Sequence, residues 1–536
     1  MTRVWAPHAD RVELDAEGRR EEMTRGERGW WTGRALGLGT DYAFVLDGGD
    51  PLPDPRSPWQ PYGVHGASRT VDHAAFAWTD NGWTPPRLAD SVVYELHVGT
   101  FTAEGTFDAA IERLAYLRDL GVDYVELLPV NAFPGAHGWG YDGVDLYAVH
   151  HAYGGPEAFQ RFVDAAHAHG IGVVLDVVYN HLGPAGNYLG RFGPYFTERY
   201  RTPWGPAVNY DDAGSDEVRA FVVDNAVMWV RDYHCDGLRL DAVHAIHDQS
   251  ALHLLEELSS AVHAVGGFVI AESDLNDPRV VTPADRGGLG CDAQWSDDFH
   301  HALHAAMTGE RDGYYRDFGP AGMVATALRG AYVYSGQHSP YRERRHGRPA
   351  TGRPATAFLG YLQDHDQIGN RAWGERSGAL LTREQLKVAA AIVLTAPFVP
   401  MLFMGEEWGA TTPWQYFTDH EDAALAEAVR KGRRAEFAAF GWEDVPDPQD
   451  RATFERSKLD WAEATGDVLD WHRALLALRR AEPGLRDGAF ADATAEGDVL
   501  TVRRGDVTVV ANLRGEPVEA DGEVLLASAA VKIVRR

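Results

Sequence analysis

The stretch GLRLDAVH at residues 237–244 decides the fold, because an apolar run leads directly into Asp241 and His244. Three other stretches have the same form, namely DVVYNH (176–181), IAESD (270–274) and LQDHDQIGN (362–370). Short apolar runs are typical of strands buried on both faces of a parallel sheet. The four stretches therefore predict parallel strands that each end in polar side chains.

Outward from this stretch, strand, loop and helix alternate at a spacing of roughly 30 to 60 residues, which is typical of βα units. Candidate strands lie at 92–101, 123–130, 172–181, 237–243, 267–273, 358–366 and 398–407. Closed βα barrels carry their catalytic groups at the carboxyl ends of the strands. We therefore predict an α/β protein built on a (β/α)8 TIM barrel, with the polar strand ends gathered in one cleft.

Smaller domains are expected on both sides of this barrel. Residues 1–85 are rich in Trp, Gly and Pro and contain short alternating runs, which predicts an N-terminal β-sandwich domain that is carbohydrate-binding-like. The barrel should occupy 86–445, with a short insertion near 182–214 after the third strand. A helical connecting segment should follow at 446–485, and the period-two alternation toward the end predicts a small C-terminal antiparallel β-domain at 486–536.

Charge and cysteine usage exclude several classes of protein. The 536 residues carry 50 Lys and Arg against 79 Asp and Glu, a formal charge of −29 that would repel nucleic acids and anionic membranes. Two cysteines cannot form a disulfide framework, and the first residues hold no apolar signal segment, so we expect a cytoplasmic protein. The apolar stretch 388–405 is interrupted by two prolines, which favours a buried helix and strand over a membrane span.

Three carboxylates at the strand ends suit glycoside hydrolysis. Cleavage with retention needs one carboxylate as nucleophile and a second, protonated one as general acid/base, about 5 to 5.5 Å apart. Asp241, Glu272 and Asp366 are distant in sequence, but the strand ends of one barrel would bring them together. Clustered carboxylates raise one another's pKa, which favours a protonated Glu272, while Arg239 on the same sheet face would keep Asp241 ionised.

Each of these motifs alone also fits a loop cap, but the four in this order resemble the conserved regions of the alpha-amylase family of glycoside hydrolases. The resemblance covers roughly residues 90–410. It implies that Asp241 is the nucleophile, Glu272 the general acid/base and Asp366 the transition-state stabiliser. It also implies sugar-binding roles for Tyr141, His181, Arg239 and His365, and structural roles for Asp176 and Asn180.

Longer stretches resemble a narrower group of that family, whose members release trehalose from the end of a malto-oligosyl chain. These stretches include HGWGYDGVDLYAVHHAYGGPE (137–157), LRLDAVHAIHDQS (238–250) and FMGEEWGATTPWQYFTDH (403–420). The resemblance implies malto-oligosyl trehalose and related α-glucans as substrates and a pathway link to a malto-oligosyltrehalose synthase. Two carboxylates suffice for the chemistry, so no cofactor is expected.

Two other functions stay open. A glucan branching enzyme, or another α-1,4-glucan transferase or amylase, would use the same carboxylates, because a sugar can intercept the glycosyl-enzyme in place of water. A catalytically silent glycan-binding protein of the same fold would be expected to have lost carboxylates, whereas this chain has all three. Histidines at 150–151 and at 300, 301 and 304 are expected to pack in the core or on the surface, and no metal site is predicted.

Two positions depart from the family pattern. His244 stands where many members have Lys, and Asp364 stands where Asn is more usual, which adds a charge beside Asp366.

Flat aromatic rings suit glucose, so several aromatic residues are candidates for the groove. We expect His244, Trp408, Trp414 and Gln415 to shape the trehalose side and Trp204 to bind sugar; Trp139, Trp295, Trp373 and Tyr416 are further candidates.

Overall fold

The computed structural model of the chain describes residues 1–202, 205–438 and 445–536. Eight parallel strands close into a barrel, which confirms the predicted (β/α)8 fold. Their order around the barrel is β10, β13, β16, β17, β18, β21, β22 and β9. The strands are β9 (Val93–Leu96), β10 (Tyr124–Leu127), β13 (Gly172–Val177), β16 (Gly237–Leu240), β17 (Phe268–Ala271), β18 (Ala293–Trp295), β21 (Phe358–Gly360) and β22 (Val399–Phe403).

The sequence pattern located seven of these strands and missed β18. That strand is three residues long, Ala-Gln-Trp, and pairs with β17 and β21 through two register positions each. A strand of three residues with Gln at its centre is too short to show a periodicity or an apolar run. The closure of the barrel therefore rests on a strand that the sequence did not indicate.

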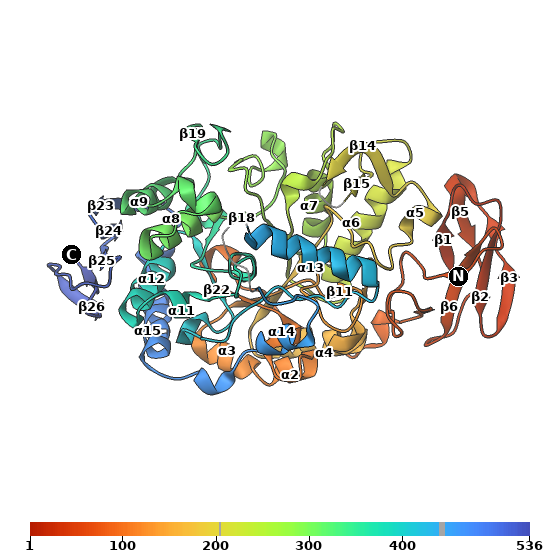
Figure 1. Cartoon of the computed structure of the whole chain (residues 1–536), viewed down its shortest axis with the longest axis horizontal. Coiled ribbons are helices and arrows are strands. Elements are labelled where there is room, and N and C mark those ends of the chain that lie inside the picture. Colours follow the sequence, from red (N-terminus) through yellow and green to blue (C-terminus); the bar gives the residue numbers. More distant parts are fainter. Residues whose placement is uncertain (203–204, 439–444) are drawn as a thin grey trace.

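Helices surround the barrel and form its outer layer (Figure 1). They include α4 (Gly155–Ala168), α6 (Ser215–Arg231), α7 (Leu254–Ala264), α8 (Asp297–Thr308), α9 (Ala321–Gly330) and α12 (Arg383–Thr395). A capping box between Thr382 and Gln385 begins α12, whose last eight residues are all buried. The apolar stretch 388–405 is thus a buried helix followed by β22, as predicted, and no helix of the described ranges is long and apolar enough to cross a membrane.

Two smaller β-structures lie at opposite ends of the molecule, with the barrel between them (Figure 1). At the N-terminus, β1 (Arg3–Trp5), β4 (Thr24–Arg25) and β5 (Trp30–Thr32) form one sheet, and a second is built around β2 (Val12–Ala16), β3 (Arg19–Glu22) and β6 (Asp41–Leu46). At the C-terminus, five antiparallel strands run in the order β23 (Asp492–Glu496), β24 (Val499–Arg504), β25 (Val507–Asn512), β27 (Val531–Arg535), β26 (Glu523–Ala527). The sequence analysis predicted small β-structures on both sides of the barrel, and both are present.

The segments next to the barrel carry regular structure of their own. Strands β14 (Phe196–Thr202) and β15 (Gly205–Val208) pair antiparallel in the region that follows the third barrel strand. Helices α14 (Arg451–Arg456) and α15 (Asp467–Ala481) connect the barrel to the C-terminal sheet, and α15 packs against α12. Helix α13 (Ala423–Ala438) follows β22 and lies across the barrel opening in the view of Figure 1.

The barrel interior changes in character along the strands. Side chains alternate in and out of the barrel with a period of two along each strand, and the inward side chains of alternate strands stack in layers. The lower layers hold an apolar cluster with essentially no exposure: Val93, Tyr124, Val174, Ile270, Ala293, Trp295, Leu359, Tyr361, Val399 and Met401. Two residues further on, the inward positions of four strands are charged: Glu95, Glu126, Asp176 and Glu272. This charged layer is the floor of the candidate site.

Candidate active site

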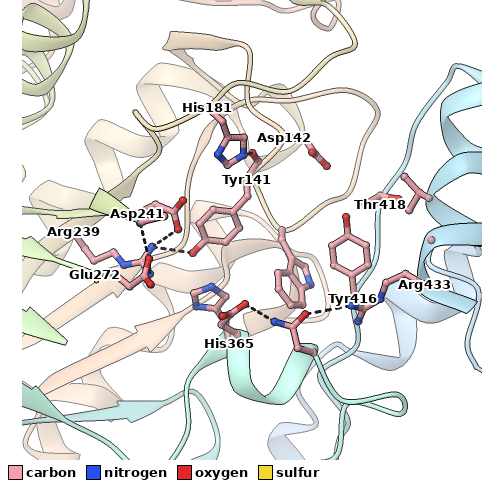
Figure 2. Close-up of a pocket in the computed structure, with 16 residues that line it drawn as sticks. Tyr141, Asp142, His181, Arg239, Asp241, Glu272, His365, Tyr416, Thr418 and Arg433 are labelled. Carbon is pink, nitrogen blue, oxygen red and sulfur yellow. Dashed lines mark hydrogen bonds and ion pairs between the residues drawn. The ribbon is translucent and has the colours of Figure 1, made fainter. Parts of the chain in front are cut away.

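A cavity of about 740 Å³ opens at the carboxyl ends of the barrel strands. Figure 2 shows its lining, which brings together groups from separate βα units. The predicted catalytic residues Asp241, Glu272 and Asp366 all line it, as do the predicted sugar-binding residues Tyr141, His181, Arg239 and His365. The three carboxylates far apart in sequence therefore share one cavity.

Arg239 is the positive centre of this site. The side chain is 2% exposed, and Nη1 contacts Asp176 Oδ2 at 2.6 Å and Asp241 Oδ1 at 3.1 Å, while Nη2 lies 3.4 Å from Glu272 Oε2. The guanidinium also stacks over the Trp295 ring, 4.2 Å from its centre. A buried cation of this kind lowers the energy of carboxylates that would otherwise repel one another.

Asp241 is held on both carboxylate oxygens. Oδ1 accepts from Arg239, and Oδ2 accepts from Asn180 Nδ2 at 2.7 Å. Asn180 Nδ2 also donates to the Asp241 backbone oxygen at 2.9 Å. With both oxygens accepting from fixed donors, the side chain is held in one orientation, as a nucleophile requires.

The backbone turn after Asp241 positions Glu272. Ala242 has φ of 39°, a left-handed conformation that a residue with a Cβ rarely adopts. In this conformation its N–H donates to Glu272 Oε2 at 2.6 Å. The residue that follows one carboxylate thus fixes the other.

Burial sets the pKa pattern of this cluster. Burial, together with the charges of Asp241 and Asp366, raises the pKa of Glu272 to about 7, against the lowering effects of Arg239 and the Ala242 N–H. Burial likewise raises the pKa of Asp176 to about 7, opposed by Arg239 and supported by Asp241. A carboxyl with a pKa near neutrality can give and take a proton at physiological pH, which suits Glu272 as a general acid/base.

Aromatic and imidazole groups form the wall beside the carboxylates. The Tyr141 hydroxyl donates to Asp176 Oδ2 at 2.5 Å, and its ring stacks on that of His365 with a centre distance of 5.1 Å. His181 Nε2 lies 3.1 Å from the Tyr141 backbone oxygen, and its Nδ1 lies 2.6 Å from Asn180 Oδ1. Because each group is held by another, the wall is preorganised before any sugar enters.

The neighbours Asp364 and Asp366 have different positions. Asp364 is fully buried at the N-terminus of α10 (His365–Gly369), where Oδ1 accepts from the N–H groups of Asp366 and Gln367. Burial raises its pKa well above the usual range. Asp366 instead faces the cavity and accepts from Asn370 Nδ2 at 2.8 Å. The unusual carboxyl at 364 is thus a helix cap, and Asp366 is the one available to a substrate.

Several residues predicted for the trehalose side do not line this cavity. Trp414 is fully buried and donates to the His365 backbone oxygen at 2.9 Å, and Trp408 and Gln415 are 6% and 5% exposed. These three residues are buried outside the cavity lining of the described residues, and their role on the trehalose side stays a prediction. His244 is exposed, 3.9 Å from Asp274 and apart from the cavity lining, and Trp204 lies outside the described residues.

Of the other aromatic candidates, some line the cavity and some do not. Trp139 and Tyr416 line the cavity, whereas Trp295 lies beneath Arg239. Trp373 is 45% exposed and stands away from that lining. Residue type alone did not separate these positions, because an aromatic ring serves equally well as packing or as a platform.

Seven further lining residues were not predicted, one of them Ala242, whose N–H contacts Glu272. Asp142, Asn370 and Thr418 occur within the quoted motifs, so their neighbours could have indicated them. Val429, Gly432 and Arg433 come from α13, a helix with no motif to mark it. Arg433 Nη2 donates to the Gly369 backbone oxygen at 2.9 Å, and its guanidinium stacks over Tyr416 at 4.8 Å. These contacts fix α13 to one edge of the cavity (Figure 2).

The histidine groups make ordinary packing contacts. His300 lies 2.6 Å from the Leu362 backbone oxygen through Nδ1 and 2.9 Å from the Tyr315 hydroxyl through Nε2. His304 Nε2 pairs with Glu310 at 2.8 Å. Within the described ranges, no group of three or more His, Cys, Asp or Glu side chains is arranged to hold a metal ion.

Comparisons with known proteins agree with this geometry. Residues 73–202 match the family model of the alpha amylase catalytic domain. Malto-oligosyltrehalose trehalohydrolase from Rhizobium sp. (strain M-11) is 52% identical over 97% of this chain and 91% of its own length. The enzyme of that name from Arthrobacter ramosus is 52% identical over 96% of this chain and 93% of its own.

A solved structure gives the same result at the level of the fold. The crystal structure of a candidate alpha amylase from Salmonella typhimurium superposes with a TM-score of 0.93 at 39% identity, covering 99% of this chain and 97% of that one. Likeness of this extent spans the barrel and both terminal β-structures. With relatives of such identity along nearly its whole length, the chain belongs to the malto-oligosyltrehalose trehalohydrolase family within the alpha-amylase glycoside hydrolases.

Proposed function

We propose that the protein hydrolyses the α-1,4-glucosidic bond next to the terminal trehalose of malto-oligosyl trehalose, releasing trehalose with retention of configuration. The observation that carries the proposal is that Arg239 contacts both Asp241 and Glu272 in one cavity, which Asp366 also lines. The names of the relatives support the choice of substrate.

In the proposed reaction, the Glu272 carboxylic acid donates its proton to the glycosidic oxygen as that bond breaks. The Asp241 carboxylate attacks the anomeric carbon and forms a β-linked glycosyl-enzyme. The ionised Glu272 then takes a proton from water, which attacks the same carbon and restores the α-configuration. The pKa of about 7 lets Glu272 act in both directions near neutral pH.

Asp366 and the aromatic wall complete the proposed site. Asp366 is placed to stabilise the positive charge that develops on the ring carbon and oxygen in the transition state. Tyr141 offers a flat face to the sugar on the donor side, with His181 and His365 as hydrogen-bonding groups. Asp176 and Asn180 hold Arg239, Tyr141 and Asp241 in place and have no proposed contact with the sugar.

The cellular setting is proposed from chemistry alone. A substrate that carries trehalose at the end of an α-glucan must be supplied by an enzyme that converts a terminal α-1,4 linkage into a trehalose linkage, which is the reaction of a malto-oligosyltrehalose synthase. Cys235 and Cys291 are buried free thiols, as expected in a reducing compartment, which supports a cytoplasmic location.

The direct test incubates the purified protein separately with malto-oligosyl trehalose and with a plain malto-oligosaccharide of equal length. Free trehalose and new reducing ends are measured in each case. The proposal expects trehalose from the first substrate and slow attack on the second. Equal cleavage of both would indicate a general amylase, and new branch points or longer chains would indicate a transferase.

A further inference from the structure

Glu95 is a buried carboxyl directly beneath the cavity, and the proposed mechanism does not use it. It is 1% exposed, lies on β9 and is absent from the cavity lining of the described residues. Oε2 accepts from the His365 backbone N–H at 3.0 Å, and Oε1 lies 2.5 Å from His365 Nδ1. Both Glu95 oxygens are therefore occupied by a single cavity residue.

The ring of His365 has one nitrogen left for a substrate. Its face stacks on Tyr141, and Trp139 lies edge-on with a centre distance of 5.7 Å. With Nδ1 bound to Glu95, Nε2 is the ring nitrogen available to the cavity that His365 lines (Figure 2). Whether Nε2 carries a hydrogen decides whether it donates to a sugar hydroxyl or accepts from it.

The proton between Glu95 and His365 decides that question. If the proton sits on Glu95 Oε1, Nδ1 accepts it and the neutral ring must carry its own hydrogen on Nε2. If the proton sits on Nδ1 and the ring is charged, Nε2 again carries a hydrogen. When the pair loses this proton, Glu95 is a carboxylate and the neutral ring carries its one hydrogen on Nδ1, which donates to Glu95. Nε2 then has no hydrogen and can only accept.

We propose that Glu95 is a positioning residue that shares a proton with His365 and thereby makes Nε2 a hydrogen-bond donor toward the substrate. The inference rests on the proposed glycoside hydrolase function and adds to it a residue that does not touch the sugar. Glu95 also joins β9 to the first turn of α10, where Asp366 lies, through the His365 backbone contact.

The charged groups around Glu95 set the pH at which this shared proton is lost. The charged groups that face Glu95 are Glu126 from β10, Arg239 from β16, and Asp364 and Asp366 at the start of α10. Burial raises the pKa of Glu95 to about 8, with Arg239 lowering it and Asp366 raising it. The same burial lowers the pKa of His365 to about 4, so the shared proton stays nearer the carboxyl until the solution becomes alkaline.

Two substitutions separate this role from simple packing. Glu95→Gln keeps both contacts, because the amide oxygen accepts from the His365 N–H and the amide nitrogen donates to Nδ1, so Nε2 keeps its hydrogen. Glu95→Leu removes both contacts at similar volume. On malto-oligosyl trehalose at pH 7 we expect Glu95→Gln to retain kcat/KM within about threefold and Glu95→Leu to lose about 10- to 100-fold.

A pH series adds a readout that a packing role would not move. Above about pH 8 the wild-type pair loses its proton, whereas the Gln variant keeps the Nε2 hydrogen at any pH. Because Glu272 titrates in both proteins, the ratio of kcat/KM for Glu95→Gln to that for wild type should rise at least threefold between pH 7 and pH 9.5, by the ordinary effect of one hydrogen bond.

The control and the double variant make the outcome decisive. Asp145 is also a buried carboxyl, 4% exposed, but lies outside the cavity lining of the described residues, so Asp145→Leu should change kcat/KM per folded molecule by less than about threefold. In a His365→Ala background, Glu95→Leu should cause no further loss.

The inference is overturned if Glu95→Leu folds and stays within threefold of wild type, if Glu95→Gln falls as far as Leu, if the ratio is flat with pH, or if the losses from Glu95→Leu and His365→Ala multiply. A wild-type protein that releases no trehalose would contradict the proposed function instead, so the two failures are distinguishable.

Discussion

The lower and upper halves of the barrel interior are built from the same strands but differ in the polarity of their inward side chains. Below, inward residues such as Val93, Val174 and Ile270 are apolar and fully buried. Two residues further along, the same strands present Glu95, Asp176 and Glu272. The lower half stabilises the fold by removing apolar surface from water, whereas the upper half places like charges together, with Arg239 as their central cation. The residues that stabilise the fold and the residues of the site are thus only two positions apart on the same strands.

The largest expected effect in the upper half is on activity. Glu272→Gln keeps an acceptor for the Ala242 N–H but cannot donate a proton to the glycosidic oxygen. We expect kcat on malto-oligosyl trehalose to fall about 10²- to 10⁴-fold, the usual contribution of a general acid/base. A variant with near-normal turnover would exclude Glu272 from the reaction.

The same variant should be at least as stable as wild type. The pKa of Glu272 is raised from 4.5 to about 7 in the folded protein, so the folded state disfavours the charge. Between those values the folded state binds the proton more tightly than the unfolded chain, and the free energy of unfolding falls as pH rises. Removing the carboxylate should therefore raise Tm at pH 7.5 to 8, as measured by scanning calorimetry.

The next effect is the pH dependence of the wild-type enzyme. Glu272 must be protonated in the free enzyme to start the reaction, so kcat/KM should decline above about pH 7 and approach a tenfold loss per pH unit. Initial rates between pH 5.5 and 9 at subsaturating substrate would measure this limb. A profile that stays flat to pH 9 would show that another group donates the proton.

The smallest effect on activity, and the largest on stability, is expected in the lower half. Leu359→Ala empties space in the fully buried apolar cluster and should lower the free energy of unfolding by about 2 to 5 kcal/mol. Because Leu359 is outside the cavity lining of the described residues, kcat per folded molecule should change by less than about threefold. Urea unfolding followed by tryptophan fluorescence, together with rates below the transition, would test both parts. A loss of kcat without a loss of stability would contradict the division of the barrel.

The sequence by itself determined the chemistry of the strand ends. Apolar runs followed by Asp241, Glu272 and Asp366 predict buried parallel strands with carboxylates at one end, because strand periodicity and residue type are local properties. The resemblance to a known family then supplied roles for Tyr141 and His365, both of which line the cavity. Local pattern was sufficient to locate the carboxylates that follow a strand, but it gave no signal for Glu95 within β9.

Tertiary structure alone decided which side chains face the substrate. Trp414 and Trp139 are the same residue type, but one is fully buried and the other lines the cavity, because exposure depends on what packs above a residue. The three-residue strand β18 and the contribution of α13 likewise depend on contacts between segments distant in the chain. The Glu95 to His365 pairing is of the same kind, since it joins the first barrel strand to helix α10, which follows the seventh strand. Sequence patterns report the preferences of neighbours along the chain, whereas burial and proton sharing arise only when distant segments meet.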